Sequence, residues 1–374
     1  MSTASRLRTP LYDAHRRLGG RLVDFAGWEM PVQYPSGIIA EHLAVRSTCG
    51  VFDLSHMGRL FLRGADALTL AQLCVTRNLS RLANGEAAYT VLCLPDGGIL
   101  DDVIVYLLGL DELLFVVNAS NRETDLNWLL EHRDRRGLHV TLNDQTLDTA
   151  LIGIQGPTAQ ALLQPHCPAD LDKLPGYSFL AADVVGRPAL VARTGYTGED
   201  GFEVMVEAEH AERVWNALLE AGAQPAGLGA RDTLRTEAAM ALYGNELDTR
   251  TNPYEARLGW VVSLSKPDFI GREALTELKA RGPARRLVGL TVAAGGVPRH
   301  GFPVLDDGQR IGHVTSGTFA PSLRRNVALA YVPTERANVG QAVGVEMRGK
   351  AVPAEVATLP FVPNHTRPRA GATR

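Results

Sequence analysis

Two adjacent carboxylates stand at the head of a segment that otherwise has the pattern of a buried strand. The stretch 97–106, GGILDDVIVY, places Asp101 and Asp102 before β-branched and aromatic residues, and the turn-forming residues PDGG overlap its start. Because neighbouring strand residues face opposite sides of a sheet, one carboxylate points at the core whichever face is buried. Such a group must be paired, hydrogen-bonded or protonated, which is common at functional sites, although two solvated acids at a strand end would give the same pattern.

Length and composition indicate a globular protein of more than one domain. The chain has 374 residues, beyond the ~250–300 residues over which a single core keeps growing, so two or three domains are expected. The hydrophobic fraction of 45% and the charged fraction of 21% are ordinary for a globular protein. The net charge of −3 argues against nucleic acid or an anionic membrane as the main partner.

The cysteines and histidines show no recognisable ligand spacing. Cys49, Cys74, Cys93 and Cys167 lie far apart, as expected for reduced, buried thiols in a cytosolic protein. The histidines lack metal-binding spacing, so no metal site is expected. The N-terminal stretch has no signal-peptide pattern and no run approaches the ~20 apolar residues of a membrane helix, so a cytoplasmic location is expected. The segment 227–232, GLGARD, lacks the third glycine of a dinucleotide-binding loop.

Helical and extended patterns alternate around the acidic strand up to about residue 275. Ser120 and Glu123 have the spacing of a capping box, and the leucines after them predict a helix that ends near Gly137. A helix over 230–243 is expected to end with Gly244 as its C-cap. Further helices are expected over 36–46, 65–74 and 208–221, and from Gly156 onward.

The pattern changes after residue 278. The segment 279–286, KARGPARR, is charged and contains Gly and Pro, as a linker would. Short β-rich runs follow from 287 to 359 at regular spacing, which predicts a sandwich or a barrel. The tail 367–374 is expected to fray unless it contacts the rest of the chain.

Seven motifs in order along the chain give a family resemblance. The sequence resembles the T-proteins, the aminomethyltransferases of the glycine cleavage system, and the resemblance continues through the DFIG and PFVP segments at 268–271 and 360–363. Each motif alone is weak, but seven in register are specific. They are TPLYD (9–13), DFAGWEMP (24–31), FDLSHM (52–57), GGILDDVIVY (97–106), GYTGEDGFE (195–203), ARDTLR (230–235) and LYGNE (242–246).

The resemblance implies an α+β fold of three domains in a clover-leaf around a folate channel. Two interleaved α/β-containing domains would occupy residues 1–278, and a C-terminal β-barrel domain would occupy 284–374. The implied enzyme transfers the one-carbon unit of an aminomethyl group, carried on the lipoyl arm of the H-protein, to tetrahydrofolate. The products are 5,10-methylenetetrahydrofolate, ammonia and the dihydrolipoyl carrier. The family needs neither metal nor flavin, and its partners are the H-protein and the other components of the system.

The resemblance also implies roles for individual residues. Asp102 matches the essential acid of the Asp-Asp pair, and a carboxylate there would stabilise the iminium-like charge that builds on the transferred carbon. Asp101 stays the alternative because strand phase alone does not choose the face. Glu203 would hold the amino-pyrimidine edge of the pterin, and Arg231 could bind a folate carbonyl or carboxylate unless it only forms a surface ion pair with Asp232. The remaining candidates around the folate are Met57, Tyr89, Asn118, Tyr196, Tyr243 and, near the C-terminus, Arg367.

Two rival functions remain open for the same fold. Relatives include folate-dependent demethylases and the C-terminal halves of flavin-dependent oxidising enzymes, and the latter would carry an N-terminal nucleotide-binding domain. Other relatives are non-catalytic folate-binding proteins with a Lys-Gly-Cys-Tyr-x-Gly-Gln-Glu motif, and no cysteine here has such neighbours. A folate titration with and without aminomethylated carrier separates binding alone from turnover.

Overall fold

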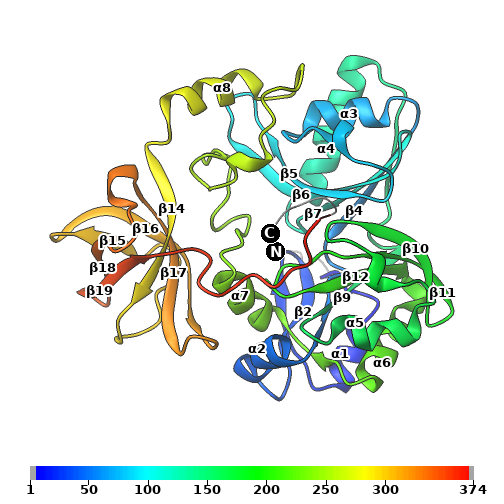
Figure 1. Cartoon of the computed structure of the whole chain (residues 1–374), viewed down its shortest axis with the longest axis horizontal. Coiled ribbons are helices and arrows are strands. Elements are labelled where there is room, and N and C mark those ends of the chain that lie inside the picture. The colour runs from blue at the N-terminus through cyan, green and yellow to red at the C-terminus, as the bar shows by residue number, and fades with distance from the viewer. Residues whose placement is uncertain (1–5, 370–374) are drawn as a thin grey trace.

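A computed structural model describes residues 6–369. The last five residues of the tail 367–374 therefore lie outside the described residues. Three lobes surround a central region, and the chain returns to that region after the last strand (Figure 1). Within residues 6–369, no helix is both long enough and apolar enough to cross a membrane.

One lobe is a five-stranded antiparallel sheet with two helices packed against it. The chain order β4 to β8 is rearranged in space to β5-β6-β7-β4-β8, so β6 lies inside the sheet between β5 and β7. Its core includes Leu70, Val105 and Phe115. The elements are β4 (Gly58–Arg63), α3 (Ala67–Cys74), the short helix η1 (Leu79–Arg81), β5 (Ala87–Cys93), β6 (Ile99–Gly109), β7 (Glu112–Val117), α4 (Arg122–Arg136) and β8 (Thr141–Asp144).

A second lobe is a six-stranded sheet whose strands come from both sides of the first lobe in the sequence. The strand β3 precedes the first lobe and pairs with β9, which follows it, so the two lobes are interleaved as expected. Trp215 is fully buried in its core. The elements are α1 (Tyr12–Arg17), β3 (Gly50–Asp53), β9 (Thr149–Gln155), α5 (Ala159–Leu163), η2 (Gln164–His166), η3 (Leu171–Lys173), β10 (Phe179–Val184), β11 (Arg187–Ala192), β12 (Gly201–Glu207), η4 (Ala208–His210), α6 (Ala211–Glu220) and β13 (Gln224–Pro225).

The C-terminal lobe is a closed barrel of six strands. Closure comes from β14, which pairs with both β17 and β19, and this confirms a barrel rather than a sandwich. The expected linker 279–286 is shorter than the sequence indicated, because α8 (Arg272–Arg281) extends into it and β14 begins at Arg285. The strands are β14 (Arg285–Val292), β15 (Pro303–Asp306), β16 (Gln309–Ala320), β17 (Arg325–Pro333), β18 (Ala342–Met347) and β19 (Lys350–Ala357), with η6 (Thr334–Arg336) after β17.

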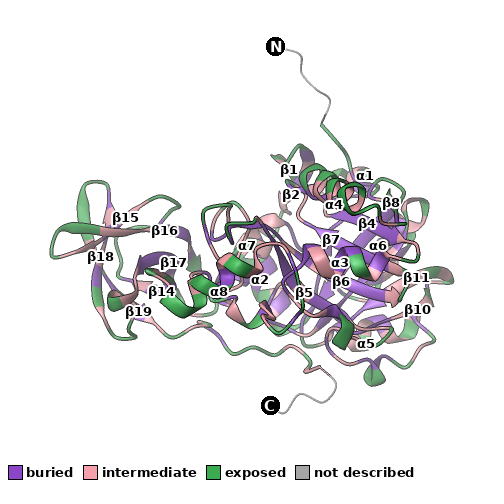
Figure 2. Cartoon of the chain, turned by 90° about the horizontal axis from the view of Figure 1, so that it is seen from above, coloured by how far each residue is buried: buried purple, intermediate pink, exposed green. Residues whose placement is uncertain are grey.

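Other elements lie between the lobes. The hairpin of β1 and β2 comes before α2, and α7 packs against both α2 and β2 and contacts the barrel strand β16. Buried residues run along the strands of the two large sheets, while the helices expose their outer sides (Figure 2). The remaining bounds are β1 (Arg21–Phe25), β2 (Trp28–Gln33), α2 (Ile38–Ser47), α7 (Leu228–Glu237) and η5 (Gly259–Val261).

Two sequence predictions about helix ends were wrong. At α4 the N-cap residue is Asn121 and no side chain caps the helix, so the capping box of Ser120 and Glu123 does not form, although Gly137 ends the helix in the left-handed conformation as expected. The helix α7 ends at Glu237 rather than near Tyr243, because Ala239 has a positive φ of 56°. Side chains hold the backbone of the segment that follows in place of helical hydrogen bonds.

Candidate active site

A cavity of about 800 Å³ lies where the three lobes meet. That volume is within the ~300–1,000 Å³ range of small-molecule sites. Its wall takes residues from β5, β6, the loop before β12, α7, the segment 238–245 and the chain after β19. All nine residues singled out from the sequence line it, although they come from positions 57 to 367: Met57, Tyr89, Asp102, Asn118, Tyr196, Glu203, Arg231, Tyr243 and Arg367.

Asp102 faces the cavity from β6. The Tyr89 hydroxyl donates a hydrogen bond to its Oδ2 at 2.9 Å, and Asn118 Nδ2 donates to its Oδ1 at 2.9 Å. Burial, followed by the charge of Asp101, raises the pKa of Asp102 to about 7, while the Tyr89 and Asn118 hydrogen bonds oppose that rise. The carboxyl group therefore changes charge near neutral pH, where a group can both accept a proton and stabilise a cation.

Asp101 points to the opposite face of β6 and is fully buried. It accepts hydrogen bonds from the Asn118 backbone at 3.1 Å, from Asn118 Nδ2 at 2.8 Å and from Asn121 Nδ2 at 2.6 Å. It does not line the cavity. Of the two acids, Asp102 is thus the one that a bound molecule can touch. The alternative of two solvated acids at a strand end is wrong, because Asp101 is fully buried and both carboxyl groups are hydrogen-bonded.

Glu203 and Arg231 form a second polar region of the wall. Glu203 is only 7% exposed, and its Oε2 accepts hydrogen bonds from Thr194 Oγ1 at 2.5 Å and from the Tyr106 hydroxyl at 3.5 Å. Burial raises the pKa of Glu203, and the Thr194 hydrogen bond and the charge of Arg231 oppose the rise. A polar edge that offers N–H donors would match this carboxylate.

Arg231 lies in the first turn of α7, and its guanidinium sits 4.5 Å from the centre of the Tyr196 ring. The surface ion pair with Asp232 does not form, because Asp232 pairs with Arg235 at 2.7 Å. Burial lowers the pKa of Arg231, because the cavity wall shields its guanidinium from water. The arginine and the aromatic ring together give the cavity one flat, positively charged surface.

Three further candidates line other parts of the cavity. Met57 packs against the apolar cluster between the sheets, and Tyr243 donates to the Ile99 carbonyl at 3.4 Å from the segment after α7. Arg367 lines the cavity, but its guanidinium binds Asp172, with 2.8 Å from Nη2 to the backbone oxygen. Its charge is therefore already partnered.

Sequence reasoning missed Trp260. Its ring stacks on Tyr89 with centroids 5.8 Å apart, the Arg77 guanidinium lies 5.5 Å from its centre, and it is 60% exposed. The residue lines the cavity. A tryptophan within an apolar run has the same pattern as a core residue, so no sequence signal could have marked it.

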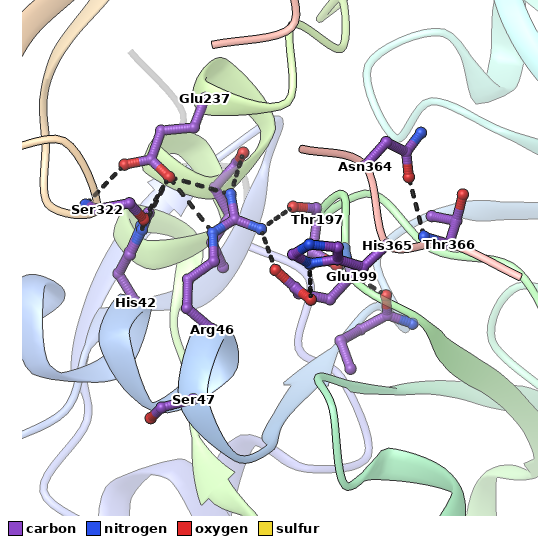
Figure 3. Close-up of polar contacts among 12 residues, drawn as sticks. His42, Arg46, Ser47, Thr197, Glu199, Glu237, Ser322, Asn364, His365 and Thr366 are labelled. Atoms are coloured by element: carbon purple, nitrogen blue, oxygen red, sulfur yellow. Dashed lines mark hydrogen bonds and ion pairs between the residues drawn. The ribbon is translucent and has the colours of Figure 1, made fainter. Parts of the chain in front are cut away.

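A buried charged cluster joins the lobes beside the cavity (Figure 3). Arg46 on α2 bridges Glu199 at 2.9 Å and Glu237 at 3.1 Å, and Glu237 also accepts hydrogen bonds from Ser322 of the barrel. His365, in the segment after the barrel, contacts Glu199 at 3.0 Å. We call residues 358–369 the C-terminal strap. The strap crosses from the barrel to the second lobe, where the Pro368 carbonyl accepts from Gly176.

Comparisons with known proteins identify the family of this fold and cavity. Residues 11–266 match the GCVT N-terminal domain, and residues 285–363 match the glycine cleavage T-protein C-terminal barrel domain. The chain therefore belongs to the glycine cleavage T-protein family, which confirms the family, the α+β fold class and the C-terminal barrel expected from the sequence.

Relatives that match over nearly the whole chain carry one name. A protein named aminomethyltransferase from Rubrobacter xylanophilus is 52% identical over 95% of this chain and 94% of that protein. Another from Halothermothrix orenii is 46% identical over 95% of this chain and 99% of that protein. The crystal structure of glycine cleavage system aminomethyltransferase T from Bartonella henselae has a TM-score of 0.91 at 34% identity, covering 97% of this chain and 100% of that one.

Proposed function

We propose that the chain is the aminomethyltransferase of a glycine cleavage system and transfers a one-carbon unit from a lipoyl carrier, the H-protein, to tetrahydrofolate. The carbon leaves sulfur and the amino nitrogen and forms bonds to two folate nitrogens. The two protons that those nitrogens lose go to the carrier sulfur, giving a thiol, and to the amino group, giving ammonia. The other components of the system would reload the carrier.

The observation that supports this proposal most is the position of Asp102. Its carboxyl group lines the cavity, is held by Tyr89 and Asn118, and has a pKa raised to about 7 by burial and by Asp101. As a carboxylate it would stabilise an iminium-like carbon and accept a proton from a folate nitrogen. Asp102 is thus our candidate catalytic residue.

Tetrahydrofolate fits the chemistry of the other walls. Glu203 would accept hydrogen bonds from the amino-pyrimidine edge, and Arg231 would donate to a folate carbonyl or carboxylate. Tyr196, Met57 and Tyr89 would contact the ring faces, with Asn118, Tyr243 and Arg367 at further points of the wall. The region 1–278 would supply most of this site as two interleaved subdomains, and the region 284–374 would close one side of it.

The test is a transfer assay with purified chain, aminomethylated carrier and tetrahydrofolate. We expect ammonia and 5,10-methylenetetrahydrofolate in equal amounts, with dihydrolipoyl carrier as the third product. Folate binding by calorimetry without any turnover would contradict the proposal and favour a non-catalytic folate-binding protein. Turnover only with sulfonium or N-methyl substrates would favour a demethylase.

A further inference from the structure

A third carboxyl group lies behind the acidic pair and has no role in the reaction described so far. Asp125, in the first turns of α4, is fully buried. Neither of its carboxyl oxygens accepts a hydrogen bond from any donor in residues 6–369. Its carboxyl group lies against that of Asp101, close enough for the two groups to share a hydrogen bond. Two carboxyl groups can share a hydrogen bond only if one of them carries a proton.

The hydrogen bonds decide where that proton sits. Asp101 accepts three N–H hydrogen bonds, two from Asn118 and one from Asn121, and each stabilises the charged form. Asp125 accepts none, so its ionised form would have no compensation for burial. Burial raises the pKa of Asp101 as well, but its hydrogen bonds oppose that rise, so Asp101 is the better carboxylate of the two and Asp125 the better proton donor. In agreement, burial and then the charge of Asp101 raise the pKa of Asp125 well above its usual range.

Asn118 connects this pair to the cavity. Its Nδ2 donates to Asp101 Oδ1 at 2.8 Å and to Asp102 Oδ1 at 2.9 Å. The same nitrogen also donates to the Asp102 carbonyl at 3.1 Å, so its two hydrogens are shared between Asp101 and Asp102, and the position of the amide depends on both residues. A change in the position of Asp101 would therefore move Asn118 and, with it, Asp102.

The other titratable groups near the three carboxyls come from separate elements. Tyr89 on β5 donates a hydrogen bond to Asp102. Tyr243 lies in the segment after α7, and its burial, followed by the charges of Asp101 and Asp125, raises its pKa to about 12. Arg122, in the same turn as Asp125, forms its ion pair with Asp144 at 2.6 Å. Charge on Asp125 would thus face other acids and phenols.

We propose that Asp125 is a positioning residue that stays protonated at neutral pH, donates its proton to Asp101 and so fixes Asn118 and Asp102 at the cavity wall. It also keeps the negative charge behind Asp102 at one rather than two. The effect on rate rests on the proposed function, whereas the protonation state of Asp125 does not.

The protonation state can be measured without any activity. Protein labelled with carbon-13 at the aspartate carboxyl groups is titrated by NMR in wild type, Asp125→Asn and Asp102→Asn. At pH 8 we expect one signal of a protonated carboxyl group that disappears in Asp125→Asn and persists in Asp102→Asn. Absence of such a signal, or its persistence in Asp125→Asn, would overturn the proposal, since an acid in the first turns of a helix is otherwise stabilised as an anion.

The positioning role is tested by comparing two substitutions. Asp125→Asn keeps a neutral donor to Asp101, so kcat should stay within about twofold of wild type, whereas Asp125→Ala should lower kcat roughly tenfold, the loss expected for one hydrogen bond, with unchanged folate Kd. Glu123→Gln, an exposed acid in the same turn, is the matched control and should change nothing. An Asn variant as slow as the Ala variant, or a fully active Ala variant that folds, would overturn the positioning role. If no variant transfers a one-carbon unit, the proposed function fails while the NMR result stands.

Discussion

The Tyr89 hydroxyl reaches Asp102 diagonally across β5 and β6, since Val91 rather than Tyr89 is the residue directly opposite Asp102. The hydrogen bond favours the carboxylate and opposes the effect of burial. Removing it in Tyr89→Phe should therefore raise the pKa of Asp102 further above about 7. The acid limb of the kcat profile should move to higher pH, with activity lost at pH 7 and recovered in alkaline buffer. A limb that stays in place or moves to lower pH would contradict this assignment, and Tyr12→Phe, away from the cavity, serves as control.

Asp102→Asn should keep the fold and the folate affinity but lose most turnover. Removing one preorganised electrostatic group typically lowers the rate by ~10²–10³. Asp101→Asn is the comparison, and we expect it to lower thermal stability because its three N–H donors are matched to a carboxylate. A folded but inactive Asp101→Asn beside an active Asp102→Asn would show that the wrong acid was chosen.

Glu203→Gln should weaken tetrahydrofolate binding by about 1.5–3 kcal/mol, the range for hydrogen bonds to a charged group. The amide keeps the shape of the side chain but replaces one acceptor oxygen by a donor. Calorimetric titration measures the change. Glu207→Gln, at the exposed end of the same strand, should leave affinity unaltered, and equal affinities for both variants would refute the role of Glu203.

Much of the site was predictable because it depends on short motifs, and the parts that failed depend on long-range contacts. Strand alternation required one buried carboxylate but could not tell Asp101 from Asp102, because the buried face is set by β7 and α4. The segment 238–243, AAMALY, is composed of good helix formers, yet Arg235 donates to the Met240 carbonyl and Glu246 accepts from the Leu242 N–H, and these contacts override propensity.

The choice between barrel and sandwich was open for the same reason. Closure depends on Leu290 pairing with Val356, residues that are far apart in the sequence. Asp125 escaped notice because an acid in the first turns of a helix is ordinary in sequence. Only the three-dimensional contact with Asp101 makes it unusual.

Arg46→Met should destabilise the protein by about 3–5 kcal/mol, the range for breaking a buried ion pair by removing one partner. The substitution leaves Glu237, which is fully buried, and Glu199, which is 3% exposed, without their shared cation. Denaturant unfolding provides the measurement. Arg63→Met removes the half-exposed ion pair with Glu112 and should lower the free energy of unfolding by no more than about 1 kcal/mol. A similar loss of stability in both variants would show that the buried cluster stabilises the protein no more than a surface ion pair does.

The carrier reaction should respond to salt. A carrier that must dissociate after each turnover requires a small, partly polar interface around the cavity mouth. If local basic residues such as Arg77, which lies 5.5 Å from the ring centre of the cavity-lining Trp260, meet an acidic carrier, the KM for the carrier should rise with ionic strength. The reverse reaction with free dihydrolipoate, ammonia and methylenetetrahydrofolate should depend on salt much less. Equal salt sensitivity in the two assays would favour apolar docking instead.

The C-terminal strap sets the order in which a newly made molecule can become competent. The cavity wall begins at Phe25 and includes Asn364, Thr366 and Arg367, so nearly the whole chain separates its first and last contributors. A ribosome-bound chain can complete both sheets and begin the barrel while the wall still lacks these residues. A ligand can meet a complete wall only after Arg367 has been added, and messages truncated just before codon 364 would yield folded lobes around an open site.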